Sequence, residues 1–323
     1  MRNAARSQKG AALLIVLLLA ATLSFVALSA MQRTSLAAAR TANVSARGEA
    51  LWRAMAVETL SLAAIEQLVA SESAKMSIDD DWAREPIEFP LEDGAARVRI
   101  ADATACFNVN RLGAAYGELQ TEVHIGEFAR LAGSLGISEF EALALAETIG
   151  DWIDQDTNRR PQGGEDEYYS ALPSPYRTGN QAMVSTSELR AVKGVSREIY
   201  GTLKPYVCAR GAGATAAVNV NMLTERDAPL LAAILGPETT VQTAEDIIAS
   251  RPPGGYDSLE AFMASPGMEP LEADYSGRFQ ITSRYLIARA EIVYGTALLE
   301  MTSMIEVTDQ GAKVISRRIG AEE

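Results

Sequence analysis

The longest hydrophobic run of the chain lies near its start and predicts a helix that crosses a membrane. Residues 11–32 carry no charge, whereas the ten residues before them hold Arg2, Arg6 and Lys9 and no acid. A helix of this length spans a bilayer core of roughly 30 Å. A buried core helix is the alternative, but such a run would be an aggregation hazard in a soluble protein.

The helical pattern continues beyond the apolar run. No proline occurs from Ala11 to Met76, Gly48 is the single glycine, and residues 31–70 are rich in good helix formers. We therefore expect one long helix, with its transmembrane part at 11–32 and an extramembrane part at 33–78.

Alternation of apolar and polar residues predicts strands in two distant parts of the chain. Residues 95–103 alternate after the turn signal Asp93-Gly94, and residues 278–295, 296–307 and 312–320 form three similar stretches separated by further turn signals. We expect residues 79–111 and 276–323 to form one antiparallel sheet on which the long helix packs.

Residues 112–275, between these strands, show mainly helical patterns. The segment CFNVNRL at 106–112 is echoed by VNVNMLT at 218–224, which suggests two related sub-blocks. The predicted fold class is therefore α+β, with a large inserted all-α domain.

Charge and composition narrow the function. The formal net charge of -13 would repel phosphate backbones, so we expect no nucleic-acid partner. His124 is the single histidine, and Cys106 and Cys208 are the two cysteines, which leaves little material for a Ser-His-Asp relay or a zinc site. We expect no enzyme.

The short basic leader ends in Lys9-Gly10 directly before the apolar run, and this pattern resembles the type IV prepilins. The resemblance implies that a prepilin peptidase cuts between Gly10 and Ala11 and methylates the new amine of Ala11. It also implies a leader, residues 1–10, in the cytoplasm, one helix in the inner membrane, and the bulk of the chain in the periplasm. A secretory signal peptide is the alternative, although its candidate cleavage sites near Ser29 are only fair.

The helical insert carries landmarks of a narrower family. The segments at 151–156, 163–181, 187–195 and 203–208 resemble the K family of minor pseudopilins of the type II secretion system. The resemblance implies a pilin-like fold and a noncatalytic subunit at the tip of the periplasmic pseudopilus, active in protein export across the outer membrane. The implied partners are the minor pseudopilins I and J.

Ile15 supports a place at the tip. It would be residue five of the mature chain, where most pilins have a glutamate thought to neutralise the amine of an adjacent subunit. An uncompensated carboxylate in a bilayer costs several kcal/mol. A subunit that docks beneath no other has no such amine to meet. The alternative is that Ile15 is one more membrane-facing residue.

Cys106 and Cys208 form either one disulfide or two buried thiols. Export of the domain would favour the disulfide, and we expect the two to be joined.

An acidic loop is the candidate site. Asp154, Asp156, Asn158 and Glu165 fall at positions 1, 3, 5 and 12 of a calcium-loop template, but Arg159 replaces the glycine at position 6, so the loop is no EF-hand. The family resemblance implies structural calcium. The leading ligand candidates are Asp154, Asp156, Glu165, Asp166 and Asn180, with Asp151 and Asn158 as second choices.

Three other readings stay open at this point. The acids could be an ordinary solvated loop or a catalytic carboxylate pair. The spacing Leu189-x-x-Val192-x-Gly194-Val195 resembles the helix-hairpin-helix modules of competence-type DNA-binding proteins, with Lys193, Arg197 and Lys204 as phosphate contacts. The simpler explanation of Gly194 is a tight turn between helices.

Overall fold

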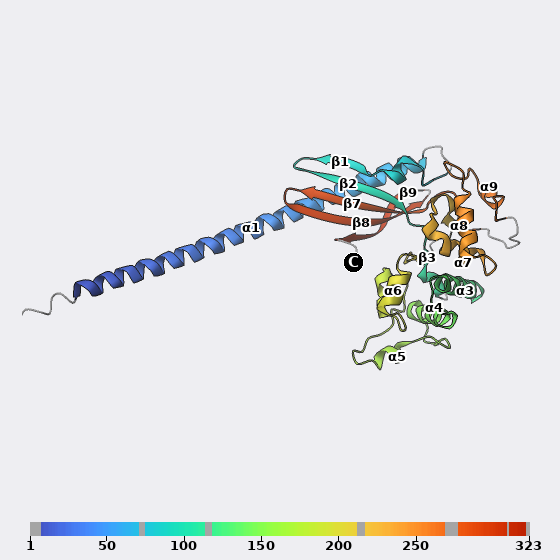
Figure 1. Ribbon diagram of the computed structural model, residues 1–323, viewed down its shortest axis with the longest axis horizontal. Coiled ribbons are helices and arrows are strands. Elements are labelled where there is room, and N and C mark those ends of the chain that lie inside the picture. Colours follow the sequence, from blue (N-terminus) through green and yellow to red (C-terminus); the bar gives the residue numbers. More distant parts are fainter. Residues whose placement is uncertain are drawn as a thin grey trace, which may run out of the picture.

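A long helix projects from a body made of one sheet and a helical domain (Figure 1). The computed structural model describes residues 8–70, 75–113, 118–211, 217–268, 277–308 and 310–320. Residues 1–7 of the expected leader and the expected boundary at 275–276 lie outside the described residues.

Helix α1 (Gln8–Ala70) is the long helix predicted from the sequence. It ends earlier than the expected residue 78. Beyond the gap at 71–74, the N–H of Met76 donates to the carbonyl of Ile281 (2.8 Å), and the N–H of Ser77 donates to Asp80 Oδ2 (2.8 Å). These tertiary and side-chain bonds replace the helical ones, so residues 75–80 form an irregular connection.

The second part of α1 packs on a five-stranded antiparallel sheet. The strand order is β1 (Ile87–Leu91), β2 (Gly94–Asp102), β7 (Tyr285–Tyr294), β8 (Ala297–Thr308) and β9 (Gly311–Ile319). Alternate residues of the central strands face the helix and are buried, as the period of two predicts. The shared core holds Ala50, Ala54, Val57, Ile65, Val98, Ile100, Leu286, Ile292 and Ile305. The predicted α+β pilin-like fold is confirmed.

Glu58 adds a polar tie to this apolar contact. Its buried carboxylate accepts hydrogen bonds from Ser303 and from the guanidinium of Arg317. Burial alone would raise the pKa of Glu58, but these bonds hold it below its ordinary value. The pair fixes how α1 sits along the sheet, since a shift of one turn would leave a buried charge unpaired.

The helical domain has its own core. Its helices are α3 (Glu118–Ser134), α4 (Glu139–Ile153), α5 (Asp166–Ser170), α6 (Arg197–Leu203), α7 (Ala228–Leu235), α8 (Val241–Ala249) and α9 (Leu259–Met263), with short 3₁₀ turns η1 (Val109–Leu112), η3 (Thr186–Ala191), η4 (Val220–Met222) and η5 (Glu225–Asp227). The segment 187–194, predicted to be helical, forms a 3₁₀ turn instead. A capping box at Ser185 starts the turn and the left-handed Gly194 ends the segment, so too few residues remain between them for a longer helix.

Two boundaries of the head differ from the expected ones. Phe107 and Val109 fall within the expected head segment 79–111, and Phe279 falls within 276–323, yet all three pack into the helical core. The reason is two short parallel pairs, β3 (Phe107–Asn108) with β4 (Val207–Cys208), and β5 (Val218–Asn219) with β6 (Phe279–Gln280). Each pair lies at the entry to the helical domain and belongs to it.

The sequence echo at 106–112 and 218–224 corresponds to matching geometry. Asn110 exchanges two hydrogen bonds with the backbone of Met183, at 2.9 and 2.7 Å, and Asn221 exchanges the same two with Tyr256, at 3.0 and 2.7 Å. All of these partners are buried. In each half of the helical domain, the side-chain amide of an asparagine therefore pairs with the backbone of a distant residue, as a neighbouring strand would.

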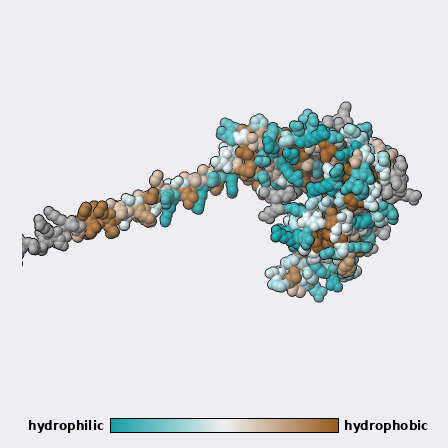
Figure 2. Space-filling model, viewed as in Figure 1, coloured by the Kyte–Doolittle hydropathy of each residue, from teal (hydrophilic) through white to brown (hydrophobic). Residues whose placement is uncertain are grey.

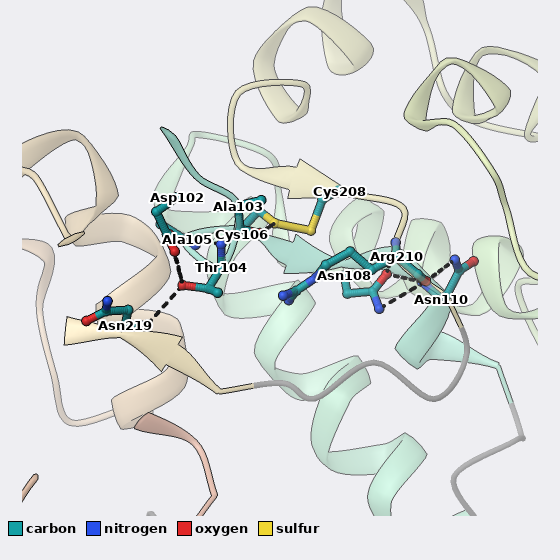
Figure 3. Close-up of a disulfide and its surroundings, with 10 residues drawn as sticks. All are labelled: Asp102, Ala103, Thr104, Ala105, Cys106, Asn108, Asn110, Cys208, Arg210 and Asn219. Carbon is teal, nitrogen blue, oxygen red and sulfur yellow. Dashed lines mark hydrogen bonds between the residues drawn. A yellow bond between two sulfur atoms is a disulfide. The ribbon is translucent and has the colours of Figure 1, made fainter. Parts of the chain in front are cut away.

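Cys106 and Cys208 are joined in a disulfide beside the first parallel pair (Figure 3). Their Cα atoms lie 5.7 Å apart, and 102 residues separate them in sequence. The expected disulfide is confirmed, and it ties the entry of the helical domain to the end of its first half.

Labelling of the native or denatured chain without reductant should therefore find no free thiol. Replacing both Cys106 and Cys208 by serine should lower the free energy of unfolding by about 4–5 kcal/mol, because the disulfide restricts a loop of about 100 residues in the unfolded chain. Thermal or denaturant unfolding of both proteins in detergent measures the difference. Two reactive thiols in the unreduced, denatured chain would contradict the disulfide.

Candidate metal centre

Three acidic side chains from the predicted loop converge at the end of α4. Asp154 caps the carboxyl end of α4, Asp156 follows two residues later, and Glu165 precedes α5. One carboxylate oxygen of each lies within 4.8 Å of the others. Asp154 and Glu165 are buried, whereas Asp156 is exposed, so the cluster opens to solvent on one side.

Three carboxylate oxygens of this cluster are buried without a hydrogen-bond donor. Among the described residues, neither oxygen of Glu165 and not Asp154 Oδ1 has a hydrogen-bond partner. Burial, and the neighbouring carboxylates of Asp151 and Asp154, raise the pKa of Glu165 to about 7. Burial likewise raises the pKa of Asp154 to about 6, against the pull of Arg160. At neutral pH, a buried carboxylate cluster of this kind requires a bound proton or a nearby cation.

Arg160 supplies one positive charge from within the loop. Its Nη1 donates to Asp151 Oδ1 at 2.8 Å and to Asp154 Oδ2 at 3.0 Å, and its backbone N–H donates to Asp151 Oδ2 at 3.1 Å. Asp151, a second-choice ligand, is therefore committed to Arg160. A Cβ atom at Gly163 would lie 1.9 Å from Asp151 Oδ2, so glycine is required for the loop to close here.

Two leading candidates lie in a second, adjoining group. Asp166 Oδ1 accepts hydrogen bonds from the N–H and hydroxyl of Thr178, at 2.9 and 2.8 Å, and Asn180 Oδ1 lies 2.6 Å from the same hydroxyl. The N–H of Asn180 donates to the carbonyl of Trp152 (3.0 Å), which holds this group beside the end of α4. The bonds from Thr178 lower the pKa of Asp166.

The last candidate, Asn158, uses its backbone here. Its N–H donates to Asp156 Oδ1 at 2.7 Å, which forms a local turn. The structure thus brings together Asp154, Asp156 and Glu165, joins Asp166 to Asn180 through Thr178, and pairs Asp151 with Arg160. The sequence had not indicated the roles of Arg160 and Thr178, since both depend on how the loop folds back.

The hairpin suspected of DNA binding holds this loop in place. The ammonium of Lys193 donates to the carbonyls of Gln162 and Gly163, at 3.1 and 2.7 Å, and its backbone N–H donates to the hydroxyl of Tyr169 (3.0 Å). Gly194 makes the turn with φ of 84°. This geometry fits the simpler explanation, a tight turn between helices.

The aromatic residues of the loop pack on one another. The ring centroids of Trp152 and Tyr169 lie 5.2 Å apart, as do those of Tyr169 and Tyr176. Tyr169 is buried, and burial raises its pKa to about 12. These rings therefore give the loop its small apolar core.

The raised pKa values give a test of the cluster's electrostatics. With chelator present, the melting temperature of the full chain in detergent should fall as pH rises from about 4.5 to about 7. Between pH 4.5 and about 7 for Glu165, and between pH 3.8 and about 6 for Asp154, the unfolded chain has released the proton while the folded chain still binds it. Stability is thus highest below the window. Glu165→Gln should flatten the slope, and an unchanged slope in that variant would contradict the assignment.

Most of the chain, including the acidic loop, is similar to known proteins of one family. Models of the family described as type II secretion system protein K match residues 105–212 and 218–282. A type II secretion system protein K of Pectobacterium carotovorum is 33% identical, with 97% of each chain covered. That of Klebsiella pneumoniae is 32% identical, again with 97% of each chain covered. That of Aeromonas hydrophila is 33% identical, with 98% and 99% covered.

A solved structure is similar over most of the chain. It comes from the crystal structure of the GspK-GspI-GspJ complex of the enterotoxigenic Escherichia coli type 2 secretion system, with a TM-score of 0.75 and 26% identity. The match covers 88% of this chain and 100% of that one. None of these comparisons supports the DNA-binding alternative.

Proposed function

Because the chain belongs to the type II secretion system protein K family, and is a minor pseudopilin of that system, we propose that it caps the tip of the periplasmic pseudopilus. The carrying observation is the match to protein K over 97% of both chains, together with likeness to a solved K–I–J complex. Its role is structural: it is a noncatalytic assembly subunit in protein export across the outer membrane. Its partners in the tip are the minor pseudopilins I and J.

The membrane placement rests on α1. Within the part of the chain that the structure describes, α1 is the one helix long and apolar enough to cross a membrane, and its most apolar window of 18 residues has a mean hydropathy of 2.8 with none of it buried. Figure 2 shows the apolar colour concentrated on the part of α1 far from the body. This helix anchors the chain in the inner membrane, with its body in the periplasm.

The shape of the chain supports the tip position. The helical domain lies at the end of the sheet farthest from the start of α1 (Figure 1), so it would be the most membrane-distal part of the subunit. A domain of this size is hard to stack within a helical array of small heads. Ile15, which is 58% exposed on α1, offers no carboxylate for the amine of a subunit above it.

A co-purification experiment tests the tip position. The full chain in detergent, mixed with candidate minor pseudopilins I and J, should form a complex that holds one copy of this chain at one end. Native mass spectrometry gives the copy number, and electron microscopy gives the position. An Ile15→Glu variant should lose secretion in a cell that depends on this subunit, since its carboxylate meets no amine. Regular repetition along a filament shaft would contradict the proposal.

Processing follows from the same assignment. We expect a prepilin peptidase to cut between Gly10 and Ala11 and the new amine of Ala11 to be methylated. Mass analysis of the amino terminus of the membrane-inserted chain should show a methylated Ala11. A start near Ala30, or an intact leader, would show a different export route.

We also propose that calcium is held by the acidic loop. The all-oxygen donor set of Asp154, Asp156 and Glu165, with its unpartnered buried oxygens, suits a hard cation that takes six to eight oxygen ligands. Asp166 and Asn180 adjoin this cluster and are the further candidates. When bound, calcium would supply positive charge that offsets carboxylate repulsion and orders the loop; its role is structural.

Chelator should therefore lower the melting temperature of the full chain in detergent, and added calcium should restore it, because the ion binds the folded state. Asp154→Ala and Glu165→Gln should each abolish this response. Glu167→Gln removes an exposed carboxylate two residues further along, in the first turn of α5; it is the matched control and should respond like the unaltered chain. If chelator leaves the melting temperature unchanged, the loop holds no structural calcium and is an ordinary solvated surface loop.

A further inference from the structure

A basic stretch of α1 lies between its apolar run and the part that packs on the sheet. Residues 33–48, here called the neck, hold Arg33, Arg40 and Arg47, and no acid occurs in the neck or anywhere before it. Most of the neck stands clear of the sheet and of the helical domain (Figure 1), and Ala50 is the first buried residue of the described part of α1. A chain with a net charge of -13 thus carries a purely basic segment directly after its apolar run.

The three arginines of the neck have no partner among the described residues. All three are exposed, and no hydrogen bond or ion pair joins them to another described residue. The next arginine of α1 differs, since Arg53 pairs with Glu49 at 2.7 Å and lies over the ring of Tyr294, 3.9 Å from its centroid. The neck arginines are therefore available to a group from outside the chain.

The neck arginines belong to a regular stripe on one face of α1. They recur every seven residues, and Ala37 and Val44 lie between them, so the steps along the chain alternate between four and three. With 3.6 residues per turn, these five positions share one face, here called the α1 stripe. Val44 is 72% exposed on it. Alternating steps of four and three are typical of a helix that packs along another helix.

The same steps, continued along α1, reach residues that the sheet covers. Beyond Leu51 the buried positions on this line are Ala54, Glu58, Ser61 and Ile65. The carboxylate of Glu58 is paired there with the guanidinium of Arg317. In the body, therefore, a packed element covers this line of α1 and supplies the opposite charge, whereas in the neck the line carries the reverse charge and nothing described covers it.

We propose that the α1 stripe docks a helix of a partner protein, one with carboxylates every seven residues and small or apolar residues between them. Successive arginines of the stripe lie about 10.5 Å apart along α1, and carboxylates seven residues apart on a nearly parallel helix have the same spacing. Guanidinium groups bind carboxylates through paired hydrogen bonds. Complementary charges along such a seam determine which helices pair and in which register.

An extended segment or a lipid surface fits the α1 stripe less well. An extended segment rises about 3.3 Å per residue, so about three residues separate two arginines, and side chains three residues apart point to opposite faces. For a helix that leaves the bilayer upright, Arg47 lies about 21 Å beyond Arg33, more than twice the Debye length of about 8 Å. Headgroups beside Arg33 would therefore leave Arg47 unmatched, whereas a helix along the neck meets all three arginines.

The inference deepens the proposed function, because it gives the chemistry of a helix that this subunit meets in an assembly. Its test uses a synthetic helix and needs neither pseudopilin I nor J. Failure of the peptide to bind would therefore leave the tip complex standing, and failure of the tip complex would leave the peptide result standing.

Binding of a labelled helical peptide tests the proposal. The probe has five heptads with glutamate at every seventh residue and alanine at the intervening stripe positions, and it is cross-linked to stay helical, since isolated helices are marginal in water. The full chain in detergent is titrated into it and followed by fluorescence anisotropy. We expect saturable, salt-sensitive binding that Arg40→Gln with Arg47→Gln weakens about three- to tenfold, because two exposed ion pairs are lost.

A matched variant and a matched peptide serve as controls. Arg190→Gln with Arg197→Gln removes the same charge from exposed positions of the helical domain and should bind like the unaltered chain. A peptide of the same composition with glutamate at every fifth residue spreads its charges around the helix, so it should bind more weakly than the probe. Both double variants should melt like the unaltered chain.

The membrane alternative is tested with the same probe. In nanodiscs of anionic lipid the peptide should still bind, because the headgroups do not reach the upper part of the α1 stripe. Loss of peptide binding in these nanodiscs would assign the stripe to the lipid surface instead. Equal binding of the two peptides, equal loss in the two double variants, or no binding of the probe at low salt would also overturn the proposal.

Discussion

The buried side chain of Asn219 is the junction on which the arrangement of the two parts of this molecule depends. Its amide nitrogen donates to the carbonyl of Met76 (3.1 Å) and to the hydroxyl of Ser283 (3.0 Å), and its backbone N–H donates to the hydroxyl of Thr104 (3.0 Å). These partners follow α1, follow β2 and precede β7. Since buried polar groups must be paired, the two chain crossings between sheet and helical domain and the segment after α1 are held together at this one side chain.

The same asparagine device, used twice, explains where the candidate metal centre lies. The closing bonds of Asn110 reach Met183, 73 residues away, whereas those of Asn221 reach Tyr256, 35 residues away. Much of the extra length in the first half is the acidic loop, which has no counterpart in the second. A long insertion with a small aromatic core needs other sources of order, and Arg160, Lys193 and a bound cation would supply them.

The pattern of apolar and polar residues predicted most of the fold, because the long helix and the strands each follow from the hydrophobic pattern of one continuous segment. It also predicted the disulfide and the acids that form the cluster. Features set by contacts between distant segments escaped it. The irregular connection after α1 depends on Ile281, and the role of Arg160 depends on how the loop folds back.

The sheet with α1 and the helical domain each have a separate apolar core, so a change in one can leave the packing of the other intact. The sheet and α1 share one apolar cluster, tied by Glu58, and the helical domain has another that includes both parallel pairs. The buried rings of the acidic loop, Trp152 and Tyr169, belong to the second. Ordering or loosening that loop would therefore change the outer surface of the helical domain while the anchor helix and the sheet keep their packing.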